Sequence, residues 1–155
     1  MLSILHKTSA LIATGLIATF WTTTVFSELF LTRPEITAVK TAIPYGMILL
    51  VSMIATAGVT GFRLAHGRTA GVIGTKRRRM PIVAINGVLV LAPAALFLSI
   101  RAQAGQFDTS FALVQAAELA AGAVNLGLML LNVRDGRRMT AGRRRKVAKG
   151  EKPLS

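Results

Sequence analysis

Residues 109–133 read TSFALVQAAELAAGAVNLGLMLLNV, an apolar run with no basic residue and a single acid, Glu118. A helix needs about 20 residues to cross about 30 Å of hydrocarbon, so this run is long enough to span a membrane. Three more apolar runs of similar length occupy roughly residues 8–26, 41–62 and 81–100. Lipid offers no hydrogen bonds to an open backbone, and the alternating pattern of a membrane β-barrel is absent. We therefore predict four transmembrane helices.

The composition agrees with a membrane protein. Of the 155 residues, 52% are apolar and 16% are charged, and the mean hydropathy is +0.56. Soluble domains of this size carry about a quarter charged residues. The chain contains no cysteine, which excludes disulfides and thiolate metal sites. We expect no enzyme acting alone, because no histidine lies at membrane depth to activate a hydroxyl and no nucleotide-binding motif is complete.

Turn-forming residues separate the four runs. Residues 33–35 contain a proline that marks the first joint, and Pro81 stands at the predicted start of the third helix. Residues 105–108 form a tight polar turn, with Asp108 as the N-cap of the fourth helix. Short connections make consecutive helices antiparallel neighbours. We expect an all-α, up-down bundle of four helices within residues 1–139.

Basic residues are distributed unevenly along this predicted topology. Sixteen of the nineteen lie in the N-terminal segment, in the loop of residues 63–79 and in the tail from Arg134. The other two loops hold Arg33, Lys40 and Arg101. The positive-inside rule then places both termini in the cytoplasm.

Two runs of four basic residues lie on this predicted cytoplasmic side. They are Lys76, Arg77, Arg78 and Arg79, and Arg143, Arg144, Arg145 and Lys146. Neither has interleaved aromatic residues or a nucleic-acid-binding fold around it, so we predict contacts with anionic lipid headgroups and no nucleic acid partner. Residues 140–155 are charged with little apolar content, and we expect them to form a disordered basic tail.

A set of residues recurs along the fourth helix at spacings of three and four. The set, which we call the polar seam, comprises Gln115, Glu118, Gly122, Asn125, Met129 and Asn132. These spacings keep all six on one helical face, which we expect to face the bundle interior. Asn86 of the third helix lies at a depth similar to that of Asn125, so the two amides are expected to bond and hold their helices together.

Glu118 is the only acid well inside a predicted span, and no basic residue appears deep in any of them. The favoured interpretation is a neutral carboxyl group that bonds to hydroxyls such as those of residues 22–24 and Ser52, or to the backbone carbonyl freed by Pro93. The alternative is a proton-titrating or cation-binding carboxylate of a small coupled transporter, which would dimerise to enclose a pathway.

His6 and His66 are the only histidines, and both fall at the same predicted membrane boundary. Haem b between helices needs two axial histidines, which keeps a haem- or quinone-linked redox subunit open as an alternative. We favour solvated interfacial side chains, because both stand beside basic residues and no acid is near in sequence. No metal site is predicted.

Four segments resemble those of known proteins. They are His6 to Ala10, Gly58 to Arg63, Arg79 to Gly87 and Val133 to Gly136. They are similar to a group of small bacterial four-helix membrane proteins of unassigned function, which implies a bacterial inner membrane and no known chemistry. The first helix, which opens with a histidine, also loosely resembles the copper-resistance D type membrane domains, without their methionine- and histidine-rich metal patterns.

Three functions remain open. The leading prediction is a structural or accessory subunit of a larger membrane complex or homo-oligomer, in keeping with the small size and the lack of a catalytic set. The alternatives are a proton- or cation-coupled transporter that uses Glu118, and a redox subunit that uses His6 and His66.

Overall fold

A computed structural model describes the backbone of residues 1–65 and 71–148, and the side chains of residues 1–64 and 79–137. The described backbone forms helices and short connections, without a strand. The helices are α1 (Leu2–Phe30), α2 (Arg33–Ala65), α3 (Gly71–Asn86), the π-helical turn η1 (Gly87–Leu91), α4 (Ala92–Gln103) and α5 (Thr109–Ala148).

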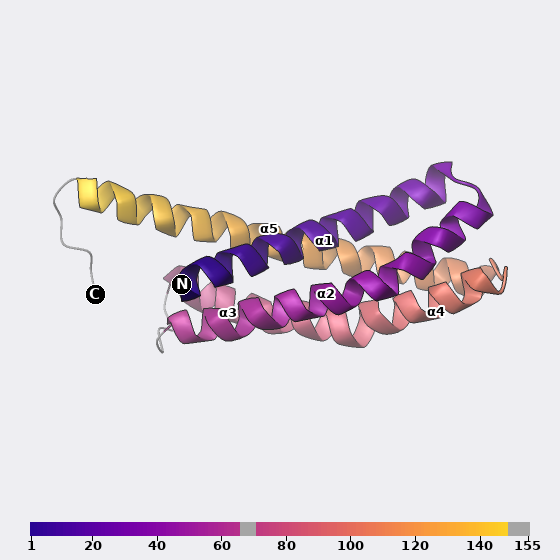
Figure 1. Cartoon of the computed structure of the whole chain (residues 1–155), viewed down its shortest axis with the longest axis horizontal. Coiled ribbons are helices and arrows are strands. Elements are labelled where there is room, and N and C mark those ends of the chain that lie inside the picture. Colours follow the sequence, from indigo (N-terminus) through magenta and orange to yellow (C-terminus); the bar gives the residue numbers. More distant parts are fainter. Residues whose placement is uncertain (66–70, 149–155) are drawn as a thin grey trace.

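Four segments within the described residues are long and apolar enough to cross a membrane. They are Leu2–Phe30, Arg33–Leu64, Arg79–Gln103 and Thr109–Arg137, of which the third combines the end of α3 with η1 and α4. This finding confirms the prediction of an all-helical protein with four candidate spans. The segments lie lengthwise beside one another (Figure 1).

Both short helix connections, at residues 31–32 and 104–108, lie at the same end of the molecule, which we call the two-turn end (Figure 1). The N-terminus lies at the opposite end (Figure 1). The second turn follows the prediction closely. Gly105 has a φ of +68°, which favours glycine, and the Phe111 amide N–H donates to Asp108 Oδ1 at 3.0 Å, so Asp108 caps α5.

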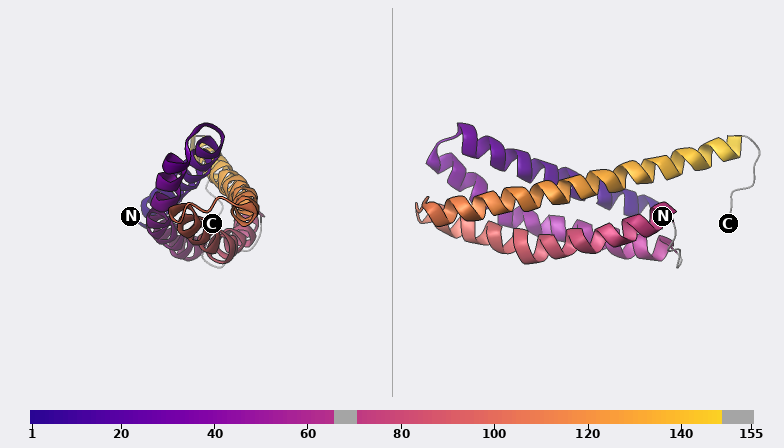
Figure 2. Two further views of the ribbon diagram at one scale, coloured as in Figure 1. Left: turned by 90° about the vertical axis from the view of Figure 1, so that its right-hand side faces the viewer. Right: turned by 180° about the vertical axis from the view of Figure 1, so that it is seen from behind.

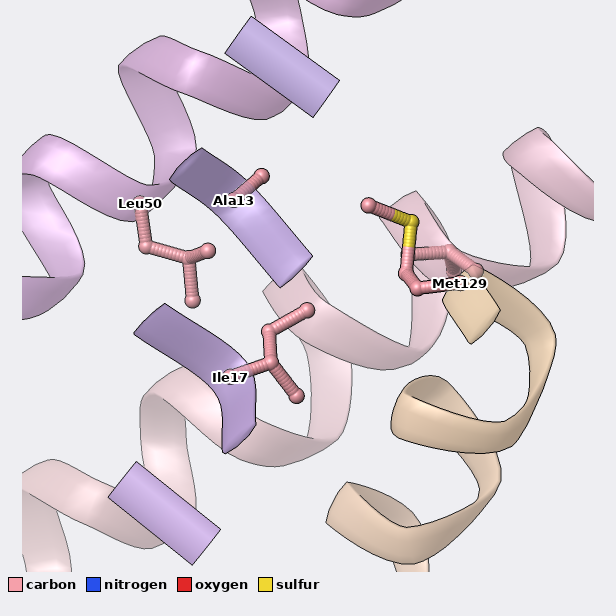
Figure 3. Packing of buried hydrophobic residues seen from close by; sticks show 5 residues of the cluster. Ala13, Ile17, Leu50 and Met129 are labelled. Atoms are coloured by element: carbon pink, nitrogen blue, oxygen red, sulfur yellow. The ribbon is translucent and has the colours of Figure 1, made fainter. Parts of the chain in front are cut away.

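α1 packs on α2 and α5, and α4 packs on the same two helices, so α2 and α5 lie diagonally across the bundle (Figure 2). Apolar side chains from four of the five α-helices meet in the middle. We call this group the central apolar cluster; it contains Ala13, Ile17, Leu50, Val83 and Met129. Figure 3 shows Ala13 and Ile17 of α1 between Leu50 of α2 and Met129 of α5.

The second helix starts earlier than its apolar run. α2 begins at Arg33 rather than near residue 41, because Pro34 fits the first helical turn and Glu35 fixes that turn from outside. Glu35 Oε2 accepts hydrogen bonds from the Thr32 amide N–H at 2.8 Å and from the Thr32 hydroxyl at 2.7 Å. As a consequence, Lys40 lies inside the helix and not in a loop.

The third helix also differs from the prediction. α3 begins at Gly71, so Pro81 lies inside a helix and not at its start. Basic residues are good helix formers, which allows the helix to extend beyond the apolar run. The wider π-helical turn η1 precedes Pro93, and the Ala92 amide N–H donates to the Gly87 carbonyl oxygen five residues back.

α5 continues to Ala148, well into the segment 140–155 that was expected to be disordered. Extending an existing helix needs no new nucleus, and lysine, arginine and alanine favour the helical state. The structure therefore differs from the expected disordered tail at residues 140–148, and disorder of the free tail stays a prediction. Residues 149–155 lie outside the described part of the chain.

Candidate functional site

The polar seam lies on the buried face of α5, as predicted. All six of its residues are buried, and Asn125 and Met129 expose only 1% and 2% of their surface. Gly122 stands at the middle of the seam. A Cβ added to it would lie 3.0 Å from Trp21 Cδ1, so the glycine lets α1 approach α5 closely. The seam therefore places polar groups in the interior of the bundle.

Glu118 forms an ion pair with Lys40 across the diagonal of the bundle. Lys40 Nζ donates to Glu118 Oε2 at 2.9 Å, and the two side chains are 1% and 11% exposed. Counted from the starts of α2 and α5, the two residues lie about 10 Å and about 13 Å along their helices, which explains why they meet. The expectation that no basic residue lies deep in a span is wrong.

This ion pair connects two helices whose backbones do not pack against each other. A lysine side chain is long enough to cross the interior from α2 to α5. Removing two charges from water costs several kcal/mol per ion, and the attraction between them offsets that cost only when both remain. The pair therefore makes the relative position of α2 and α5 depend on both side chains.

The hydroxyl partners expected for Glu118 bond elsewhere. The Thr22 hydroxyl donates to the Ala18 carbonyl oxygen at 2.8 Å, and the Ser52 hydroxyl donates to the Ile48 carbonyl oxygen at 2.8 Å. Both bonds lie within the residue's own helix. The partners of Glu118 are Lys40 and Gln115, whose Nε2 donates to Glu118 Oε2 at 3.3 Å.

Glu28 of α1 adds a second carboxylate to this cluster, within electrostatic reach of both Lys40 and Glu118. Glu118 alone is bonded to the Lys40 ammonium group. Glu28 Oε1 and Gln115 Oε1 are buried, and no group among the described residues donates a hydrogen bond to either. The cluster therefore contains two buried acceptor oxygens without a donor. Glu28 lies just beyond the apolar run of residues 8–26, so it is not among the residues predicted for the site.

Two cavities flank the cluster. The larger, of about 410 Å³, lies towards the two-turn end, and we call it the two-turn cavity. It is lined by Glu28, Arg33, Ile36, Phe107, Asp108, Phe111, Ala112, Gln115, Ala116 and Leu119. The smaller, of about 60 Å³, is mostly apolar and includes Glu118, Trp21, Ile17 and Leu50 in its wall. Ile17 and Leu50 also belong to the central apolar cluster, so the smaller cavity borders that cluster.

The predicted bond between Asn86 and Asn125 is present. Asn86 Nδ2 donates to Asn125 Oδ1 at 2.9 Å and to the Ala121 carbonyl oxygen at 2.9 Å. Asn125 Nδ2 in turn donates to the Val83 carbonyl oxygen at 3.3 Å. These bonds join the third span to α5 and satisfy most of the polar atoms of both amides.

Asn132, at the other end of the seam, donates from Nδ2 to Met80 Sδ at 3.4 Å. Nearby, Arg79 Nη1 donates to Asp135 Oδ2 at 2.9 Å. Arg79 had been assigned to lipid headgroups, and the structure instead gives it a carboxylate partner on α5. The side chains of the other predicted headgroup residues, Lys76, Arg77 and Arg78 with Arg143, Arg144, Arg145 and Lys146, lie outside the described residues.

His6 is half-buried between α1 and α2, in contrast to the solvated side chain that was expected. Its Nδ1 lies 3.0 Å from the Ala57 carbonyl oxygen and 3.3 Å from Thr60 Oγ1. A Cβ added at Gly61 would lie 3.0 Å from His6 Cε1, so the glycine leaves room for the ring. His66 lies outside the described residues, and the proposed histidine pair stays a prediction.

The fold and the charged cluster define a class of protein: a helical protein with four candidate membrane-spanning segments and a charged cluster inside the bundle. No known protein family, curated protein or solved structure matches the chain. The resemblance to small bacterial four-helix proteins and to copper-resistance D type domains stays a prediction. The function must therefore be argued from the site itself.

Proposed function

We propose that the protein is a structural or accessory subunit of a larger assembly in a bacterial inner membrane. The observation that carries this proposal is the Lys40–Glu118 ion pair, which joins helices on opposite sides of the bundle. An interior held by such a pair and by interhelical amide bonds favours one fixed arrangement of helices. A fixed arrangement presents constant outer faces to a partner.

The same proposal includes an up-down topology with both termini in the cytoplasm. Its support is the distribution of basic residues, sixteen of nineteen of which fall on that side. The ion pair of Lys40 strengthens this asymmetry, because a lysine paired inside the bundle no longer counts towards the opposite side. Reporter fusions at residues 66–70 and at the C-terminus should both report a cytoplasmic location.

The experiment that tests the proposal is purification of the tagged protein from its native membrane in a mild detergent, followed by mass spectrometry. The wild-type protein should retain a reproducible set of membrane partners. Glu118→Lys alone should lose them, because it places two ammonium groups in the interior. Lys40→Glu combined with Glu118→Lys should recover them, because the pair is restored in reverse. A protein that elutes alone or as a homodimer would contradict a role in a larger assembly.

The second candidate is a proton- or cation-coupled transporter, and the observation that favours it is the pair of cavities beside the charged cluster, one lined by Glu118 and the other by Gln115 and Glu28. Transport would then require a carboxylate at position 118 on α5, and a pair of opposite charges in the reverse order would not be sufficient. The reversed pair would then fail to support substrate-driven proton flux in proteoliposomes, as would Glu118→Gln. Glu35→Gln is the matched control, since it changes an exposed carboxylate at the same end of the bundle.

A further inference from the structure

The two-turn cavity has the features of a binding site for a small organic molecule. Its volume of about 410 Å³ is large enough for such a ligand, and apolar walls surround a few polar atoms. Two of these polar atoms, Glu28 Oε1 and Gln115 Oε1, are buried acceptors to which no described group donates. We propose that the two-turn cavity binds a primary ammonium group attached to an apolar body.

The hydrogen bonds of Gln115 fix the direction of its free oxygen. Its Nε2 donates to Glu118 Oε2 at 3.3 Å, so the amide nitrogen faces the carboxylate. Turning the amide over would place its oxygen against the carboxylate oxygen, which is unfavourable because both are acceptors. Gln115 is only 6% exposed, and it lines the cavity. Its Oε1 is therefore a buried acceptor that a ligand with N–H donors would satisfy.

The charges around the cavity favour a cation over an anion. Lys40 is bonded to Glu118, and the Glu28 carboxyl group forms no ion pair with any described residue. Of the other charged residues of the wall, Arg33 is exposed, so water screens its charge, and Asp108 has an ion-pair partner. The Arg33 guanidinium lies 4.9 Å from the centre of the Phe107 ring, and Asp108 is paired with Arg101. An ammonium group would donate to the free oxygens of Glu28 and Gln115 and give the Glu28 carboxylate a partner of opposite charge.

The rest of the wall fits an apolar body. The rings of Phe107 and Phe111 lie with their centroids 4.9 Å apart, and Ile36 and Leu119 add aliphatic surface. A hydrated inorganic cation would leave these walls without a complementary surface. An amine on an aromatic or aliphatic group would place its charge at the two oxygens and its body against the rings.

Two sources can supply this chemistry: a soluble amine, and the ethanolamine headgroup of a lipid. Both carry a primary ammonium group. In the lipid, two methylene groups join it to the phosphate, and the acyl chains supply the apolar portion. The cavity lies at the end of the bundle where the helices turn, so either source is compatible with its position. The proposal does not rest on the accessory-subunit role, because it concerns a site within a single chain.

Ligand binding can be measured through the fluorescence of Trp21. This residue is the only tryptophan, and its Nε1 donates to the Leu119 carbonyl oxygen at 3.0 Å. Leu119 lines both cavities, so a ligand in the two-turn cavity should change the fluorescence of Trp21. We would titrate the protein in phosphatidylcholine nanodiscs with phenylethylammonium. The neutral control is 2-phenylethanol, which has the same ring and no charge. A saturable change with the ammonium compound alone is expected.

Variants then connect the signal to the site. Glu28→Gln should weaken binding by at least about tenfold, because it removes the charge and keeps the shape. Glu35→Gln removes an exposed carboxylate outside the cavity and should leave the affinity unchanged. If Glu28→Gln does not fold, Ala116→Phe tests the same point by filling the cavity from its wall. Equal binding of the alcohol, full affinity in these variants, or the absence of any saturable change would overturn the proposal.

A second arm identifies the source of the ammonium group. Replacing part of the phosphatidylcholine with phosphatidylethanolamine should lower the apparent affinity for phenylethylammonium if the lipid headgroup occupies the cavity. An unchanged affinity would assign the site to a soluble amine.

Discussion

Two polar layers in the interior of the bundle differ in how far their polar atoms are bonded within the fold. In the layer of Asn86 and Asn125, the amide groups bond to each other and to nearby backbone carbonyl oxygens. In the layer of Lys40 and Glu118, a third charged group and two unpartnered oxygens remain beside a cavity. The comparison teaches that a polar group inside a membrane bundle indicates a binding site only when its hydrogen-bonding capacity is not used within the fold.

The largest effect is expected in the charged layer. Glu118→Gln removes the carboxylate that is bonded to Lys40, and breaking a buried ion pair in this way costs about 3–5 kcal/mol. Thermal unfolding in detergent should show a large loss of stability. Glu35→Gln removes an exposed charge and keeps an oxygen that can accept the bonds from Thr32, so its loss of stability should be far smaller. A mild effect of Glu118→Gln would show that the two layers contribute alike to stability and contradict the prediction.

A smaller effect is expected in the amide layer. Asn86→Leu removes the donor to Asn125 and Ala121, and interhelical hydrogen bonds of this kind contribute roughly 0.6–2 kcal/mol. The same thermal unfolding assay should therefore show a loss of stability well below that of Glu118→Gln. Binding of phenylethylammonium should be unchanged, because Asn86 does not line the two-turn cavity. Loss of that binding would indicate that the layers act as one site.

The smallest effect is expected at the two-turn end itself, where Asp108 caps α5. Hydrogen bonds from the Ser110 hydroxyl and the Phe111 amide, together with the charge of Arg101, lower the pKa of Asp108 below its usual value. A carboxyl group with a lowered pKa in the folded state stabilises the fold above its unfolded pKa, and this contribution is lost as the pH falls through the folded value.

The unfolding midpoint of the wild type should therefore decrease slightly on acidification, and Asp108→Asn should remove that part of the decrease. The asparagine keeps an acceptor for the Phe111 amide and does not titrate. An identical acid dependence in both proteins would show that the cap contributes nothing to it.

The amide layer was predictable from sequence, and the charged layer only in part. The spacing of the polar seam fixes one face of α5, and helix depth brings Asn86 to Asn125. Lys40 was missed because its apolar run begins at residue 41, whereas α2 begins at Arg33. Counting depth from Pro34, a residue suited to the first helical turn, would have placed Lys40 inside the span.

The shape of the third span and the position of Glu28 depend on contacts between helices, which no local sequence pattern predicts. The third span contains the π-helical turn η1 and includes Pro81 within α3. Both features show how a long helix accommodates prolines. Hydropathy does not predict where a helix containing prolines begins or widens. The role of Glu28 emerges only when α1 packs beside α2 and α5, because its position near the end of α1 resembles an ordinary polar helix end. Tertiary packing determines both.

The most direct test of the account is a double-mutant cycle on the ion pair, measured by thermal unfolding in detergent. Lys40→Met and Glu118→Leu each leave one charge unpaired, whereas the double variant leaves neither. The account predicts that the double variant recovers most of the stability that the Glu118→Leu variant loses, because the buried charge is gone. A double variant that loses the sum of the two single losses would contradict a direct ion pair between α2 and α5.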